Sequence, residues 1–239
     1  MALILNLETA SPVCSVALSR NGQLLDWRES TEDKSHATRL TLLIRELLDQ
    51  SHLETDDLDA ISLSMGPGSY TGLRIGTSVA KGLAYGSNKP LIGIPTLQAL
   101  ANGFLLGSLP DVPREAHSGP VLLCPMLDAR RLEVYSALYD ISLNEISPVE
   151  ATILEPLSFG HFLDKQVVYF FGTGSNKAAE IILHPNARFV PGIELSASYQ
   201  SAPAEVLFNQ HEFLDTAYFE PHYLKEFMAG IAKNKILGT

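Results

Sequence analysis

The segment from Gly66 to Gly76 constrains the fold of this chain more than any other stretch of its sequence. It reads Gly-Pro-Gly-Ser-Tyr-Thr-Gly-Leu-Arg-Ile-Gly and lies between an apolar run, 61–65, and a run of small and apolar residues, 77–84. Glycine adopts backbone angles that are closed to residues with a Cβ atom, and proline restricts its own φ. The order predicts a strand, a tight turn and then a helix, with Ser69 or Thr71 as the N-cap. Free N–H groups at such a helix start suit an anion or the acceptors of a partner.

This turn does not match the two common phosphate-binding motifs. A Walker A loop requires Lys and then Ser or Thr directly after its last glycine, whereas Gly72 is followed by Leu73 and Arg74. The dinucleotide-binding fingerprint requires a third glycine at the position of Thr71. The pattern therefore predicts a sharp corner between a strand and a helix, and no nucleotide motif of either class.

The composition is that of a globular protein with an acidic surface. The 239 residues are 46% hydrophobic and 18% charged, and the formal net charge is −10. Because an isolated nucleic-acid-binding protein depends largely on neutralising phosphates, direct binding of tRNA or DNA is not expected. The first residues lack the basic region of a signal peptide, no apolar run is long enough to cross a membrane, and Cys14 and Cys124 form no Cys-x-x-Cys motif. We therefore expect a cytoplasmic protein.

Apolar periodicity predicts an α/β fold that begins with three antiparallel strands. The order βββαβαβα in the first half is typical of an RNase H-like unit. Asp33 or Ser35 is the expected N-cap of the first helix. The expected strands are residues 2–7, 14–19, 23–28, 58–65 and 91–94, and the expected helices are residues 36–50, 71–85 and 96–106.

A second unit is expected after residues 107–120, which are rich in proline and glycine. It begins again with strands, which hints at a duplication. We therefore expect two domains, residues 1–106 and a smaller, degenerate unit of residues 107–239. The expected strands of the second unit are residues 121–127, 133–139, 167–171 and 189–190, and its expected helices are residues 156–164, 176–183 and 202–210.

The sequence shows no catalytic or metal-binding motif. Cys14 lies in a predicted strand and is expected in the core, and no Gly-x-Ser-x-Gly motif is present. None of the histidines is spaced from another, or from a cysteine, as metal ligands usually are. They are His36, His52, His117, His161, His184, His211 and His222.

Two segments allow both a functional and a structural interpretation. Glu8, Thr9 and Ser11 form either a phosphate or metal loop or a turn with side-chain hydrogen bonds. Gly172 and Gly174, before a predicted helix, form either a phosphate cradle or an ordinary glycine corner.

The second helix has one nearly smooth flank. Gly72, Gly76, Ala80 and Ala84 recur every four residues. Glycine inside a helix costs about 1 kcal/mol relative to alanine, so this flank indicates close packing. Small side chains allow helix axes to approach closely. The flank packs either on the chain's own sheet and first helix or on a helix of another chain, and the pattern favours neither.

Several segments of the sequence resemble a known family, the bacterial TsaB (YeaZ) proteins. The resemblance is dense over residues 3–100, thinner over 121–135 and slight afterwards. The segments that carry it are residues 4–10, 14–18, 66–76, 80–84, 90–97, 128–135 and 221–224.

The resemblance implies a two-lobed actin/Hsp70-like ATPase fold and a role in making threonylcarbamoyladenosine in tRNA. TsaB is the non-catalytic paralogue that binds and activates TsaD, which carries the chemistry, and TsaE joins the larger complex. ATP or ADP and the metal then belong to the partner subunits, tRNA is reached only through the complex, and a homodimer through the same helices is an alternative. The implied interface residues are His36, Arg39, Leu40, Leu43, Leu47, Gly72, Ile75, Gly76, Val79, Ala80 and Leu83.

Two positions support a non-catalytic role. The metal-binding histidines of TsaD correspond to Thr96 and Leu100, and leucine cannot ligate a metal. Glu8 stands where many relatives have Asp, which weakens the case for a nucleotide at that turn. An independent ATPase or kinase and a protease-like hydrolase remain the alternative hypotheses.

Overall fold

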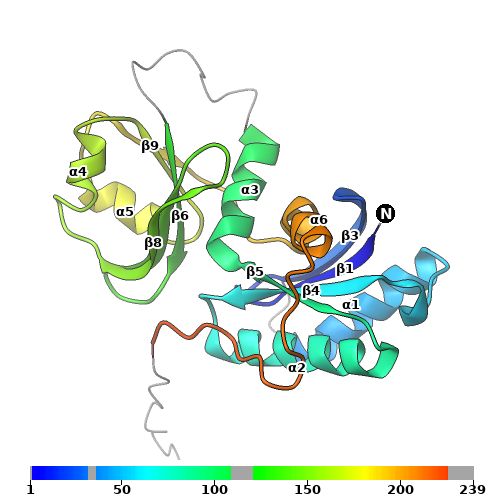
Figure 1. Cartoon of the computed structure of the whole chain (residues 1–239). Coiled ribbons are helices and arrows are strands. Elements are labelled where there is room, and N and C mark those ends of the chain that lie inside the picture. Colours follow the sequence, from blue (N-terminus) through cyan, green and yellow to red (C-terminus); the bar gives the residue numbers. More distant parts are fainter. Residues whose placement is uncertain (1, 32–35, 109–120, 226–239) are drawn as a thin grey trace, which may run out of the picture.

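The computed structural model describes residues 2–31, 36–108 and 121–225, and for His36 and Ser108 the backbone only. The predicted N-caps Asp33 and Ser35 lie outside the described residues, as does the predicted linker, residues 107–120, from residue 109 onward. The chain forms two five-stranded mixed sheets with helices packed on them (Figure 1).

The first sheet has the strand order β3-β2-β1-β4-β5. The first three strands form an antiparallel meander, and the last two join it in parallel through helical crossovers. All five strands were predicted from the sequence. They are β1 (Leu3–Glu8), β2 (Cys14–Arg20), β3 (Gln23–Ser30), β4 (Ala60–Gly66) and β5 (Leu91–Pro95).

Helices cover both faces of the first sheet (Figure 1). On one face lie α1 (His36–Gln50) and α2 (Tyr70–Ser87), and on the other α3 (Thr96–Ser108) and α6 (Ser201–Asn209). Leu40, Leu43 and Leu47 of α1 are buried in a core cluster with the strands. Each such leucine contributes about 2 kcal/mol through removal from water.

The second sheet repeats the strand order of the first. Its order is β10-β9-β6-β7-β8, again with an antiparallel meander beside two parallel strands. This confirms the predicted duplication and fold class. The strands are β6 (Leu122–Asp128), β7 (Glu133–Tyr139), β8 (Glu145–Ile153), β9 (Val168–Phe171) and β10 (Ala187–Val190), and the helices are α4 (Gly160–Leu163) and α5 (Ser175–Ile181).

Several elements of the second half differ from the prediction. Strand β8 was not predicted; it contains Pro148 and lies at the edge of the sheet, where a proline is tolerated. The helix expected over residues 156–164 is reduced to the single turn α4. Two short 3-10 helices were also not predicted: η1 (Thr55–Asp57) in the first half and η2 (Ala197–Gln200) in the second.

After β10 the chain returns to the first sheet. Helices η2 and α6 pack on β1 and β2, and Leu214 then forms a bridge with Leu91 at the edge of β5. The segment continues to the opposite face, where Lys81 Nζ of α2 donates to Ala217 O at 3.1 Å (Figure 1). The predicted second unit, residues 107–239, therefore contributes its last helix and the following segment to the first sheet.

Candidate functional site

The glycine corner joins β4 to α2 as predicted. Gly66 has a φ of +110°, which favours glycine, and the Ser69 hydroxyl caps α2 by accepting from Gly72 N at 3.3 Å. The prediction that this corner leaves backbone N–H groups free is wrong for Gly66 and Ser69. Gly66 N donates to Thr96 Oγ1 at 3.1 Å, and Ser69 N donates to Ala10 O at 2.7 Å. Both backbone N–H groups of the corner are therefore used by hydrogen bonds within the chain.

The smooth flank of α2 packs on the turn between β1 and β2. A Cβ atom added to Gly72 would collide with Thr9 O, and one added to Gly76 would collide with Thr9 Oγ1. Thr9 Oγ1 also donates to Gly72 O at 2.8 Å. Both glycines are therefore required by the chain's own fold, which is the structural interpretation of the flank.

Six of the predicted interface residues lie in the protein's own core, which corrects the prediction that they face another chain. The physical reason is that the apolar stripe of α1 and the small stripe of α2 both face the first sheet. The six residues are Leu40, Leu43, Leu47, Gly72, Gly76 and Ala80.

The remaining predicted residues lie at the margin of this core. Ile75, Val79 and Leu83 are half-buried and pack against the core cluster, and Arg39 is half-buried on α1. The His36 side chain lies outside the described residues.

The solvent-facing side of α2 carries a second set of small residues that the sequence analysis missed. This set recurs every four residues, and its members, Ser78, Gly82 and Gly86, are all exposed. A Cβ atom added to Gly82 or Gly86 would have no other atom within 4 Å. Tyr85 beside them is 86% exposed. The repeat is visible in the sequence, but only the packing shows that this stripe, and not the glycine flank at Gly72, is open.

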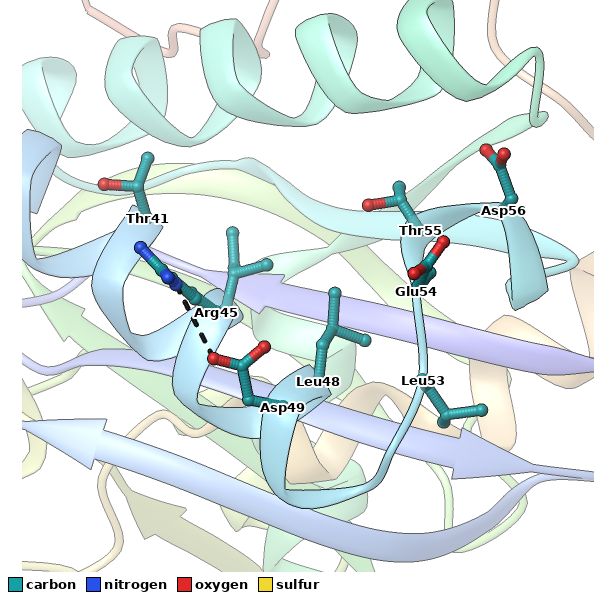
Figure 2. Close-up of a pocket in the computed structure, with 9 residues that line it drawn as sticks. Thr41, Arg45, Leu48, Asp49, Leu53, Glu54, Thr55 and Asp56 are labelled. Atoms are coloured by element: carbon teal, nitrogen blue, oxygen red, sulfur yellow. Dashed lines mark ion pairs between the residues drawn. The ribbon is translucent and has the colours of Figure 1, made fainter.

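A groove of about 440 Å³ lies between α1 and the segment before β4, beneath α2 (Figure 2). Ile44, Leu48 and Leu53 give it an apolar floor that belongs to the same core cluster as Val79 and Leu83. Its rim is polar. The rim residues are Thr41, Arg45, Asp49, Glu54, Thr55 and Asp56.

The turn at Glu8, Thr9 and Ser11, for which the sequence left a phosphate or metal loop and a hydrogen-bonded turn open, is closed by a buried polar network. Glu8 is fully buried: Ala10 N donates to its Oε1 at 2.7 Å, and Ser64 Oγ and Gln200 Nε2 bond to its Oε2. Burial raises the pKa of the Glu8 carboxyl above its ordinary value, although these hydrogen bonds oppose the rise. Thr9 and Ser11 are buried as well.

The same network reaches across the sheet. Ser62 Oγ donates to Asn6 Oδ1 at 2.6 Å and bonds to Gln200 Oε1 at 2.9 Å. The sequence analysis did not find it, because Gln200 is far from these strands along the chain. The network ties η2 to β1 and β4.

Gly172 and Gly174 form a packed corner and not an open cradle. A Cβ on Gly172 would collide with Met126 O, and one on Gly174 would lie 2.8 Å from Val134 Cγ1. Helix α5, which follows, has only seven residues.

Comparison with known proteins identifies the family. The family model for TsaD, tRNA N6-adenosine threonylcarbamoyltransferase, matches residues 30–237. The chain belongs to the TsaD family.

Within this family the chain is similar to TsaB proteins, as the sequence predicted. It is 34% identical to the tRNA threonylcarbamoyladenosine biosynthesis protein TsaB of Escherichia coli over 155 residues, which are 64% of this chain and 62% of the relative. It is 30% identical to TsaB of Bacillus subtilis over 155 residues, 63% of this chain and 62% of the relative. The matched region thus spans less than two thirds of these relatives.

The structure agrees with a solved member over nearly its whole length. YeaZ from Pseudomonas aeruginosa superposes with a TM-score of 0.80 and 26% identity, over 94% of this chain and all of the other. A second structure, of an uncharacterized protein with similarity to peptidase YEAZ from the same organism, gives the same score at 25% identity.

Thr96 and Leu100, the positions at which the resemblance places the metal-binding histidines of TsaD, are core residues. The Thr96 hydroxyl is fully buried and accepts from Gly66 N, and Leu100 packs against Gly172. Among residues 2–31, 36–108 and 121–225, no group of three or more His, Cys, Asp or Glu side chains is arranged to hold a metal ion. In the same ranges, no helix is both long and apolar enough to span a membrane.

Cys14 lies in the core, as expected. It is buried, and burial, reinforced by the charge of Glu8, raises the pKa of its thiol to about 11. A thiol of this kind is a poor nucleophile at neutral pH.

Proposed function

We propose that this chain is a non-catalytic subunit of the machinery that makes threonylcarbamoyladenosine in tRNA, and that it binds a TsaD-type transferase through the exposed side of α2. Family membership and the names of the TsaB relatives support the pathway. TsaE and tRNA are engaged through the complex, and nucleotide and metal belong to the partners.

The observation that carries the proposal is Gly82. A glycine in the exposed interior of a helix costs about 1 kcal/mol relative to alanine. Gly72 and Gly76 offset that cost because they allow close packing against Thr9. A Cβ atom added to Gly82, in contrast, would have no other atom within 4 Å, so the chain's own fold does not require a glycine there. Close approach of a partner helix over Ser78, Gly82 and Ile75 gives this glycine a role, because small side chains let helix axes come near one another.

The experiment is to replace Gly82 by leucine and measure binding to the TsaD-type protein of the same organism. The fold has room for the side chain, so the thermal midpoint should be unchanged or raised. Partner affinity should fall by at least tenfold, because the added side chain separates the helices. Gly82→Ala is the matched control and should bind far better than Gly82→Leu.

A Gly82→Leu variant that folds and binds its partner as tightly as the unmodified chain would refute this interface. Gly76→Leu cannot serve as the test, because its side chain would fall on Thr9 and disturb the fold itself.

The two alternative functions have less support. A kinase or ATPase needs an accessible carboxylate and open phosphate loops, whereas Glu8 is buried and Gly172 is packed. A cysteine hydrolase needs a reactive thiol, whereas burial of Cys14 raises its thiol pKa to about 11. Calorimetry with ATP and Mg²⁺, and a peptidase assay on a Cys14→Ala variant, test these alternatives.

A further inference from the structure

The turn that joins β6 to β7 carries two adjacent arginines in an unusual backbone conformation. Arg130 has a φ of +72° and Arg131 a φ of +50°. In this left-handed region the Cβ atom of an L-residue crowds the backbone, and glycine or asparagine is accepted more easily. Such a conformation persists only where the surrounding structure imposes it, and residues of this kind cluster at functional sites. The turn is therefore a candidate site outside the proposed interface.

The turn is held by bonds to its main chain. Asp128 Oδ1 accepts from Arg130 N at 2.6 Å, and Asp128 N donates to Thr173 Oγ1 at 3.1 Å. Lys177 Nζ of α5 donates to Asp128 Oδ1 at 3.1 Å and to Arg131 O at 3.0 Å. The arginine side chains take no part in these bonds, so the shape of the turn does not depend on them.

Both guanidinium groups are available to a ligand. Arg130 and Arg131 are exposed, and neither side chain has a partner among residues 2–31, 36–108 and 121–225. Many other basic side chains of the described chain are paired with a carboxylate. Examples are Arg28 with Asp26, Arg45 with Asp49, Lys177 with Asp128 and Lys225 with Glu133.

The charge at this turn is positive, although the formal net charge of the chain is −10. The carboxylates of Asp128 and Glu133 are each paired with a lysine. A third carboxylate, that of Glu155, lies nearby, because Leu154 N donates to Leu132 O at 2.8 Å. Four basic side chains, the two lysines and the two arginines, therefore stand against three acidic ones.

The chemistry of the two arginines fits phosphate. A guanidinium group presents a planar fork of N–H donors that matches the oxygen pairs of a phosphate. Two such groups on neighbouring residues suit neighbouring phosphates of one strand, and contacts of this kind position a nucleic acid without reading its sequence. In the proposed function the phosphate-bearing macromolecule is tRNA.

We infer that Arg130 and Arg131 contact the phosphate backbone of the tRNA while a TsaD-type partner holds it. The acidic chain alone repels RNA, so this contact forms only within the complex. The inference rests on the proposed function and adds to it a direct contact between this chain and the RNA. A free nucleotide offers the same phosphate chemistry, so the experiment includes ATP as a competitor.

The test measures binding of an unmodified tRNA transcript to the complex of the full chain with the TsaD-type protein of the same organism, over a series of NaCl concentrations. The variant Arg130→Asn/Arg131→Asn removes both charges, and asparagine tolerates the left-handed backbone. Its affinity for the tRNA at low salt should fall by on the order of tenfold. The slope of log affinity against log salt should become shallower by about 1–2, because each phosphate contact contributes about 0.7–0.9.

Arg20→Gln/Arg188→Gln is the matched control, because both arginines are exposed and the same charge is removed. Arg20 lies on the first sheet, and Arg188 lies level with the start of β6, whereas the turn follows the end of β6. The affinity and salt slope of this control should equal those of the unmodified complex. In both double variants, the affinity for the TsaD-type protein without RNA should be unchanged, and the thermal midpoint of Arg130→Asn/Arg131→Asn should not fall.

The outcomes separate the inference from the proposed function. If Arg130→Asn/Arg131→Asn assembles with the TsaD-type protein and keeps the unmodified tRNA affinity and salt slope, the RNA contact is wrong and the proposed function stands. If excess ATP with Mg²⁺ removes the difference between the unmodified and variant complexes, the arginines bind a nucleotide and the inference is overturned. If the unmodified chain does not bind the TsaD-type protein, the proposed function fails and the inference fails with it.

Discussion

Replacing Glu8 by glutamine tests whether the buried carboxyl group is neutral in the folded protein. Glu8 has no exposed surface, and its oxygens bond to Ala10 N, Ser64 Oγ and Gln200 Nε2. Burial raises the pKa of this carboxyl above its ordinary value of 4.5. Glutamine has nearly the same shape, keeps an acceptor for Ala10 N and carries no charge to desolvate.

The sign of the pH dependence follows from the raised pKa. Because the folded-state pKa lies above the unfolded-state value, the folded protein binds more protons than the unfolded chain between the two values. The contribution of Glu8 to the unfolding free energy is therefore complete below pH 4.5 and is lost as the pH rises through the folded-state pKa. Relative to the unmodified protein, Glu8→Gln should gain about 1.4 kcal/mol for each unit by which burial raises the pKa.

Glu8→Ala supplies the contrast. It leaves the buried Ala10 N–H without its acceptor, removes a partner of Ser64 and opens a cavity. A buried donor without a partner costs about 1–3 kcal/mol, so with the cavity we expect a loss of about 2–4 kcal/mol. Urea unfolding between pH 5 and pH 8, followed by far-UV circular dichroism, measures both variants. If Glu8→Gln is as destabilised as Glu8→Ala throughout this range, the network requires an ionised carboxylate and our reasoning is wrong.

Two further predictions concern α2 and the thiols. Gly72→Ala should destabilise the protein by about 2–4 kcal/mol because the added methyl group meets Thr9 O. Gly82→Ala should stabilise it by about 1 kcal/mol through helix propensity alone. Thermal unfolding measures both variants, and equal shifts of the thermal midpoint would contradict the conclusion that Gly72 is packed and Gly82 is open. Burial raises the pKa of the Cys14 thiol to about 11, so in the folded protein at pH 8 it should react with a thiol reagent on the order of a hundredfold more slowly than in urea. Rapid modification of the folded protein at Cys14 would contradict that burial.

Most of the fold followed from local patterns. The strands of the first sheet and helix α2 were predicted, with Ser69 as one of the two expected caps, because hydrophobic alternation, helical spacing and cap chemistry are local properties. Strand β8 was not predicted; most of its residues are exposed or only half-buried, so its sequence carries a weak apolar pattern.

The candidate site was predicted less well, for a reason that α2 illustrates. Gly72 and Gly82 are both glycines in the interior of the predicted helix. Helical periodicity shows which residues share a face of the helix, but it does not show which face packs on the sheet. The choice depends on the β1–β2 turn, where Thr9 fills the space beside Gly72. The Glu8–Gln200 contact likewise joins residues 192 positions apart.

By itself, the sequence determined the strands and helices of the first sheet, the corner at Gly66 and the repeated opening of both halves with strands. These depend on residue identity and short-range spacing. Only the tertiary structure decided that Gly72 and Gly76 serve the chain's own packing, that Glu8 is buried against Gln200, and that Gly82 is exposed. Burial is a property of the surroundings of a residue, and those surroundings are assembled from distant parts of the chain.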